Sequence, residues 1–223
     1  MDEIIAAIVN DDLAQLTSLL AGDQQLAMRQ ADHDRLLDSR IYHWIYVGDT
    51  ALHVAAAGYR VQLVQHLLAA GADAKAAANR RRSTPLHYAS DGFVAGPHFD
   101  PQQQLATLGL LLNAGASINA QDRNGASALH RATRTRCADA VAYLLAAGAD
   151  PLLRNESGST PLHLAVQTTG RGGSGDEVAK TGQRRIIDTF LSHGVSVTLR
   201  DGKCHTVLDC ARSPWVRELL GSA

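Results

Sequence analysis

Aromatic side chains make up only 4% of this 223-residue chain, although 45% of its residues are hydrophobic. Alanine and leucine supply most of the apolar content, which suits short, closely packed helices better than a large β core. Cysteine is also scarce, since the chain has only Cys137, Cys204 and Cys210, without the spacing of a disulfide framework. Such sparse, odd-numbered cysteine favours a reducing compartment.

Long apolar runs and an excess of either charge are likewise missing. No hydrophobic stretch approaches the length of a membrane span, and the acidic first residues lack the basic segment of a secretion signal. We therefore expect a cytoplasmic protein with no membrane partner. With 21 basic and 22 acidic residues, the chain creates no overall field for nucleic acid, and we expect no such partner. Only three of the basic residues are lysine, and this arginine bias beside abundant alanine is typical of a GC-rich bacterial genome.

A short motif returns along the chain at intervals of 34, 43, 33 and 46 residues. Each copy begins with threonine or serine, and four of the five carry Leu-His in their centre. A stripe of apolar residues at helical spacing follows each of the first four copies and ends at a glycine. Glycine at that place is typical of a helix C-terminus. The motif therefore predicts repeated helix–turn–helix units, which begin at Thr50, Thr84, Ser127, Thr160 and Thr206.

The first residues of the motif predict how each unit starts its first helix. Threonine or serine is a favourable N-cap, and Pro85 and Pro161 occupy the first helical position. The motif histidine is placed to hydrogen-bond backbone groups in the loop of the next unit. We therefore interpret the four motif histidines as structural: His53, His87, His130 and His163.

These motifs resemble the ankyrin-repeat family over about residues 45–212. The resemblance implies an all-α solenoid of about five to six helix–turn–helix repeats with degenerate terminal caps, in a single domain over 1–223. We expect a cap and long loop over 1–49, with helices over 2–9 and 12–21. A second cap is expected over 206–223, where Asp209 replaces the histidine and a last helix covers 213–220. The repeats between the caps are expected at 50–82, 83–126, 127–159 and 160–205.

The segment between Gly22 and Thr50 is longer than a regular repeat requires and contains an aromatic run over 41–47. Two interpretations fit this run. In the first, it covers the flank of the first repeat with Trp44, because aromatic side chains are usually packed. In the second, Trp44 is an exposed anchor for a partner. We favour the packing interpretation.

Two alternate repeats carry long inserts between their helices, at 91–104 and 168–183. Alternate repeats place such inserts at the same edge of a stack, with the helix–helix turn of the intervening repeat between them. Arginine at this turn matches carboxylate and phosphate groups. We hypothesise a cleft for an anionic ligand or acidic peptide, lined by Arg131, Arg134, Arg136, His98 and Arg171. The alternative is that the inserts are flexible loops, since the glycine-rich one lacks the lysine of a P-loop.

The resemblance implies a protein-binding module that acts through its concave surface and its insert loops. On that surface the first helices are expected to expose Val54, Tyr88, Arg131 and Leu164. Arg80 and Arg81, at a projecting turn where Arg82 replaces the usual glycine, are candidate contacts to an acidic partner. The alternative function is a small-molecule or anion sensor, or a rare enzyme, that uses the cleft between the inserts. A host-directed interaction protein ranks third.

Motifs for catalysis, cofactors and metals are not found in the sequence. We identify no nucleophile elbow, zinc-protease or dinucleotide motif, and therefore expect no enzyme activity and no cofactor. Cys137 follows Arg136, which predicts a lowered thiol pKa. A last group does not match zinc-ligand spacing and is interpreted as ordinary repeat positions: His193, Cys204, His205 and Cys210.

Overall fold

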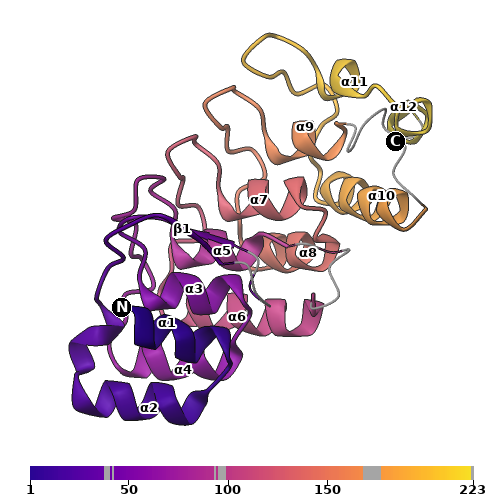
Figure 1. Ribbon diagram of the computed structural model, residues 1–223. Helices are drawn as coiled ribbons and strands as arrows, with labels where there is room; N and C mark the ends of the chain where they lie inside the picture. The colour runs from indigo at the N-terminus through magenta and orange to yellow at the C-terminus, as the bar shows by residue number, and fades with distance from the viewer. Residues whose placement is uncertain (38–40, 42, 93, 95–98, 168–176, 222–223) are drawn as a thin grey trace.

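The computed structural model describes residues 1–37, 41, 43–92, 94, 99–167 and 177–221. These residues form a row of helices with one short hairpin, and the two termini lie at opposite ends of the row (Figure 1). No helix among them is both long enough and apolar enough to cross a membrane. In chain order the elements are α1 (Asp2–Val9), α2 (Leu13–Gly22), η1 (Gln24–Ala27), β1 (Arg35–Leu37), β2 (His43–Ile45), α3 (Ala51–Ala57), α4 (Val61–Ala69), α5 (Pro85–Ser90), α6 (Pro101–Asn113), α7 (Ala128–Arg134), α8 (Ala138–Ala146), α9 (Pro161–Ala165), α10 (Glu177–Ser192), α11 (Val207–Cys210) and α12 (Pro214–Gly221).

Successive helix pairs stack so that like helices touch. The first helices α3, α5, α7 and α9 follow one another in one layer, and the second helices α4, α6, α8 and α10 form the other layer (Figure 1). Each second helix buries an apolar stripe, as Leu63, Val64 and Leu67 show in α4. This two-layer stack is the architecture that the motifs predict.

The motif histidines join neighbouring repeats. In α3, the Thr50 backbone N–H donates to His53 Nδ1 at 3.1 Å. The imidazole proton therefore lies on Nε2, which donates to the Ser83 carbonyl at 3.0 Å. All four motif rings are buried, and the other three reach the loop of the next repeat at the carbonyl oxygens of Ala126, Ser159 and Leu199. The prediction that these histidines are structural is confirmed.

The projecting turns keep their geometry although two of them lack glycine, at Arg82 and at Cys204, whose φ is +64°. Arg82 adopts a φ of +52°, where the equivalent Gly125 and Gly158 have φ values of +70° and +72°. The left-handed conformation costs a non-glycine residue about 1 kcal/mol. The next turn is tied to this one, because the Arg123 N–H donates to the Arg81 carbonyl at 2.7 Å. The substitution at Arg82 therefore adds strain without changing the turn.

In the repeats without inserts, a backbone N–H satisfies a carbonyl oxygen near the end of the first helix. The Arg60 N–H donates to the Ala55 carbonyl, and the Cys137 N–H donates to the Ala132 carbonyl, each at 3.0 Å. These donors stand at the start of α4 and α8, directly after a tight turn. A carbonyl near the end of each first helix is thereby satisfied without a side chain.

A buried glutamine takes over this role in the two repeats with inserts. Gln104 Nε2 donates to the Ala89 carbonyl at 3.0 Å, and Gln183 Nε2 donates to the Ala165 carbonyl at 2.7 Å. Both glutamines lie inside helices, because α6 begins at Pro101 and α10 begins at Glu177. The predicted inserts therefore extend too far, since their last residues are the first turns of the second helices.

Both ends of the stack have the predicted capping helices. α1 and α2 form the N-terminal pair, and α12 is the last helix. In α11, the Thr206 N–H donates to Asp209 Oδ2 at 2.8 Å, so a carboxylate replaces the imidazole in the capping box. Asp209 therefore caps the N-terminus of α11, the helix that contains it.

The long N-terminal segment forms an antiparallel hairpin in which Leu36 of β1 lies opposite Trp44 of β2. Ile41, Ile45 and Tyr46 are buried, so the segment packs against the stack as favoured from the sequence. The expectation that Trp44 is the covering side chain is wrong, because 48% of its surface is exposed. Successive side chains of a strand point to opposite faces, so Trp44, which precedes the buried Ile45 in β2, points away from the core.

Candidate functional site

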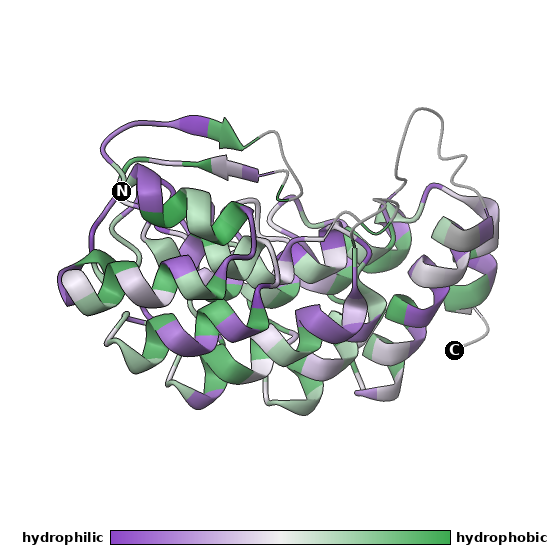
Figure 2. Cartoon of the chain, turned by 60° about the horizontal axis from the view of Figure 1, so that its bottom comes forward, coloured by the Kyte–Doolittle hydropathy of each residue, from purple (hydrophilic) through white to green (hydrophobic). Residues whose placement is uncertain are grey.

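The β1–β2 hairpin lies along one side of the stack, beside the N-terminal repeats (Figure 2). The ring of His43 packs against Tyr88 of α5, with 4.4 Å between the ring centroids. The Tyr88 hydroxyl and the Tyr46 backbone N–H both donate to Asp49 Oδ2, at 2.7 and 2.8 Å. One buried carboxylate therefore holds the hairpin against α5, and burial beside this carboxylate raises the pKa of Tyr88.

The hairpin changes which residues of the first helices meet solvent. The expectation that Val54, Tyr88 and Arg131 are exposed is wrong, because each of them is buried. Leu164, which lies farther along the stack, is half-buried. Tyr88 is covered by the hairpin ring that packs on it, and Arg131 turns toward carboxylates of the preceding repeat.

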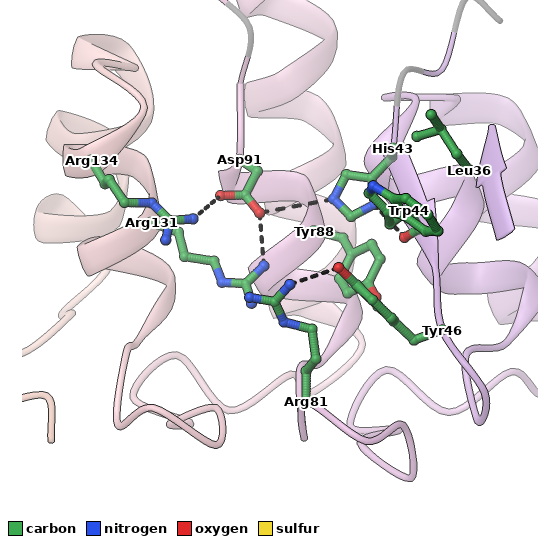
Figure 3. A pocket seen from close by; sticks show the side chains of 9 residues that line it. All are labelled: Leu36, His43, Trp44, Tyr46, Arg81, Tyr88, Asp91, Arg131 and Arg134. Carbon is green, nitrogen blue, oxygen red and sulfur yellow. Dashed lines mark hydrogen bonds and ion pairs between the residues drawn. The ribbon is translucent and has the colours of Figure 1, made fainter. Parts of the chain in front are cut away.

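A pocket of about 180 Å³ lies between the hairpin and the helices α5 and α7 (Figure 3). Hairpin residues form one wall, α7 contributes two arginines on the opposite side, and a carboxylate stands between them (Figure 3). The lining residues are Leu36, His43, Trp44, Tyr46, Arg81, Tyr88, Asp91, Arg131 and Arg134.

Arg131 is the central cation of this pocket. Its Nη1 donates to Asp91 Oδ2 at 2.7 Å, and its Nη2 donates to Asp122 Oδ2 at 2.9 Å and to Ser83 Oγ at 2.7 Å. All three partners precede α7 in the chain. The buried guanidinium therefore fixes this repeat to the one before it, and its hydrogen bonds offset the cost of burying the charge.

Asp91 contacts side chains from two elements, β2 and α7. Burial disfavours its ionised form, but the Arg131 guanidinium, together with His43 and Arg134, outweighs burial and holds the pKa of Asp91 far below its ordinary value. His43 Nε2 lies 3.9 Å from Asp91 Oδ2, and Arg134 Nη2 lies 3.4 Å from Oδ1. The carboxylate therefore stays charged at every physiological pH and links the hairpin to α7.

The three arginines predicted to form one floor are divided between two sides of α7. Arg131 and Arg134 stand three residues apart on α7 and line the pocket under the hairpin. Arg136 follows the helix with a φ of +65° and donates instead to the carbonyl oxygens of Ala165 and Gln167, at 2.9 and 2.7 Å. Its burial lowers the pKa of Arg136 to about 10. The prediction of a common floor is therefore wrong.

A second cavity, of about 530 Å³, lies on the Arg136 side of the stack. Phe99 and Pro101 from one insert-bearing repeat and Glu177 and Arg185 from the other contribute to its lining. Residues of both insert-bearing repeats therefore line one cavity, together with Arg136 and Cys137 of the repeat between them. His98 and Arg171, which were predicted to contribute to a cleft there, lie outside the described residues.

Arg80 and Arg81 contact the hairpin. Arg80 pairs with Asp34 at 2.6 Å, and its guanidinium lies 4.9 Å from the ring centroid of Tyr46. Arg81 Nη1 donates to the Tyr46 hydroxyl at 2.7 Å. Both side chains therefore hold the hairpin in addition to facing solvent.

Cys137 differs from its predicted chemistry. The thiol is buried, and burial raises its pKa, so the prediction of a lowered pKa beside Arg136 is wrong. The guanidinium of Arg136 is turned toward carbonyl oxygens of the next repeat. Across the part of the chain that the structure describes, no group of three or more His, Cys, Asp or Glu side chains could hold a metal ion.

Sequence reasoning missed the hairpin side of the pocket. No sequence motif includes Leu36, His43 or Asp91. These residues come together only because the N-terminal segment folds back onto the stack. The unusual length of that segment and its aromatic run were the available signals. Tyr88, Arg81, Arg131 and Arg134 were named from the sequence, and the structure brings these four together in the pocket.

Profiles of a known family match this chain. The profile described as "Ankyrin repeat" matches residues 47–79 and 81–123, and the profile described as "Ankyrin repeats (many copies)" matches residues 111–165. Together they cover more than half of the chain. The chain therefore belongs to the ankyrin-repeat family, and the prediction of an all-α ankyrin solenoid is confirmed.

Two known proteins are similar to part of this chain. Neurogenic locus notch homolog protein 1 of Xenopus tropicalis is 35% identical over 142 residues, which cover 53% of this chain and 6% of that protein. The B-cell lymphoma 3 protein homolog of Mus musculus is 37% identical over 120 residues, which cover 54% of this chain and 25% of that protein. The chain thus spans a quarter or less of the length of these relatives.

Proposed function

We propose that this chain binds a protein partner on the side of the stack that carries the β1–β2 hairpin. Ankyrin repeats generally serve as protein-binding modules, and membership of the family supports binding rather than catalysis. The observation that carries the proposal is the exposed pair Leu36 and Trp44 at the pocket, across from the exposed guanidinium of Arg134.

These three residue types are suited to a binding surface. Leu36 and Trp44 expose 37% and 48% of their surfaces and lie opposite one another in the hairpin, so they share one face. A partner that covered them would remove apolar surface from water. Tryptophan and arginine are also the residues that most often dominate binding energy at protein interfaces.

No observation favours the small-molecule alternative to the same degree. Arg131 and Arg136, which were to hold an anion between the inserts, already donate to carboxylates and carbonyl oxygens of the chain. These two side chains therefore do not form the open arginine floor on which that hypothesis rested. A cytoplasmic location and a bacterial source stay predictions from the sequence.

Affinity capture from an extract of the native host, followed by mass spectrometry, tests the proposed function. The bait is the full chain, compared with Trp44→Ala and with Met28→Ala as a matched control. Met28 is also exposed, at 53%, but does not line the pocket. We expect one protein in stoichiometric amount, reduced at least tenfold by Trp44→Ala and retained by Met28→Ala.

The proposal fails on either of two results. The first is that the bait captures no protein above the level of empty beads. The second is that a partner is captured equally by the wild-type chain and by Trp44→Ala, which would place the binding surface elsewhere on the stack.

A further inference from the structure

Building on the proposed function, we infer that the pocket under the hairpin accepts an acidic side chain of the partner, aspartate or glutamate, next to an apolar residue. The volume of about 180 Å³ lies below the range of roughly 300–1,000 Å³ that is usual for small-molecule sites. It suits one side chain of a peptide segment. The identity of that side chain follows from the charges and the apolar wall of the pocket.

The pocket has more positive than negative groups. The guanidinium groups of Arg81, Arg131 and Arg134 line it, and two carboxylates, Asp91 and Asp122, contact them. Among the described residues, no carboxylate lies within ion-pair distance of Arg81, which donates to a tyrosine hydroxyl instead. Asp49 is buried behind Tyr88, where it accepts from the Tyr88 hydroxyl and the Tyr46 N–H, and it does not line the pocket. The described lining therefore presents three guanidinium groups and one carboxylate, and the pocket attracts an anionic group.

Arg134 is the guanidinium that an incoming carboxylate reaches most easily. Its side chain is 59% exposed, and its contact to Asp91 is long, at 3.4 Å. A guanidinium has five N–H donors, so most of them are available to a ligand. Arg131, by contrast, is buried and occupied. It contributes positive potential behind the site without needing to move.

The apolar residue next to the acidic one in the partner would contact the hairpin. Leu36 and Trp44 stand on the side of the pocket opposite Arg134 (Figure 3). A peptide that places a carboxylate on Arg134 therefore brings an adjacent side chain to the hairpin face. A basic side chain would meet Arg134 and Arg81 instead, and like-charge contact of this kind is unfavourable.

A displayed library of random dodecapeptides, selected on the immobilised full chain, tests this inference. We expect the selected peptides to share an aspartate or glutamate beside a leucine-sized or aromatic residue. The best peptide is then compared with its amide version, in which the acidic residue is replaced by asparagine or glutamine. Fluorescence anisotropy should show an affinity at least tenfold lower for the amide peptide, because a charge-assisted bond to arginine is lost.

Two variants locate the contact. Arg134→Gln should weaken the acidic peptide about tenfold and leave the amide peptide nearly unchanged, which shows that the two groups interact directly. Arg185→Gln is the matched control, because Arg185 is 57% exposed, pairs with Asp139 and lies outside the pocket. It should leave both affinities unchanged. Circular dichroism checks that each variant is folded.

Three results overturn the inference: a selection that yields no binders, selected peptides without acidic residues, or a loss in Arg134→Gln that is equal for the acidic and the amide peptide. A preference for phosphopeptides over the acidic peptide also overturns it. These failures differ from failure of the proposed function. A host partner lost with Trp44→Ala but retained with Arg134→Gln would keep the function and remove the acidic contact, whereas capture of no partner removes the function itself.

Discussion

Arg131 forms ion pairs with two carboxylates at once. Its guanidinium is buried between Asp91 and Asp122, and the pKa values of both carboxylates are held below the ordinary value despite their burial. A cluster of this kind stabilises little relative to an apolar core, but removing one member leaves buried charge without a partner.

We predict that Arg131→Met lowers the free energy of unfolding by roughly 3–5 kcal/mol, because two carboxylates lose their counterion. Urea denaturation followed by circular dichroism measures the change. Arg134→Met serves as control: its guanidinium is exposed, so less than about 1 kcal/mol should be lost. Equal effects of the two substitutions would contradict the assignment of Arg131 as the buried counterion.

The motif histidines predict a loss of stability in mild acid. Burial lowers their pKa values, and for His87 burial together with Arg131 lowers the pKa to about 4. Between about pH 6.5 and 4 the unfolded imidazole binds a proton that the folded one does not, so stability falls as the pH falls. We expect a loss of at least roughly 2 kcal/mol between pH 7.5 and 4.5 in urea denaturation.

His87→Gln should reduce this dependence, because it removes one of the buried imidazoles, whose pKa burial and Arg131 lower to about 4. His66→Gln, at an exposed position of α4, is the control and should leave the slope unchanged. A constant stability from pH 7.5 to 4.5 in the wild-type chain would show that the buried histidines are not neutral.

The two repeats with inserts show how the end of the first helix is satisfied when the loop that follows it is longer. Lengthening the turn removes the backbone N–H that closes the first helix in the shorter repeats. Gln104 and Gln183 supply the missing donor from the second helix of the same repeat, which lies in the other helix layer. The long loop and the glutamine therefore depend on each other.

We predict that Gln104→Leu lowers the free energy of unfolding by about 1–3 kcal/mol, because it leaves the Ala89 carbonyl buried without a donor. The neighbouring Gln103 is exposed, and Gln103→Leu should change stability by less than about 0.5 kcal/mol. Chemical denaturation of both variants measures the difference. A Gln104→Leu protein as stable as the wild type would refute the capping role.

Helices were predictable from the sequence because their signals are local. Threonine caps, proline at the first position and glycine after the stripe act within one repeat, so Pro85 and Gly115 mark their elements without knowledge of the fold. The hairpin was not predictable, since the exposure of Trp44 depends on which face of β2 meets the stack. The direction in which the Arg136 side chain points depends on its positive φ, which the residue pattern does not predict.

At the scale of the whole molecule, packing weakens toward the C-terminus. α11 has four residues and buries Val207, whereas every residue of α5 is buried between its neighbours. In the last repeat Asp209 replaces the histidine that elsewhere bonds to the next loop. Solenoid stability is a sum over neighbouring units, so a unit that buries few residues against its neighbours opens first.

We predict that backbone amides of α11 exchange with deuterium at least about tenfold faster than amides of α5 and α7, because the last repeat opens without global unfolding. Hydrogen–deuterium exchange with mass spectrometry at neutral pH measures this gradient. The exposed N-terminal helix α2 provides a comparison at the other end. Uniform protection along the stack would indicate that all repeats unfold as one unit.

The Arg131 cluster limits how this array can change in length. Repeat proteins gain and lose units readily because neighbouring units meet through similar surfaces. Here Arg131 requires Ser83, Asp91 and Asp122 from the unit before it, so a unit inserted, deleted or exchanged at this junction strands a buried ion. The two units form one indivisible building block, and any duplication that preserves the fold has to copy them together.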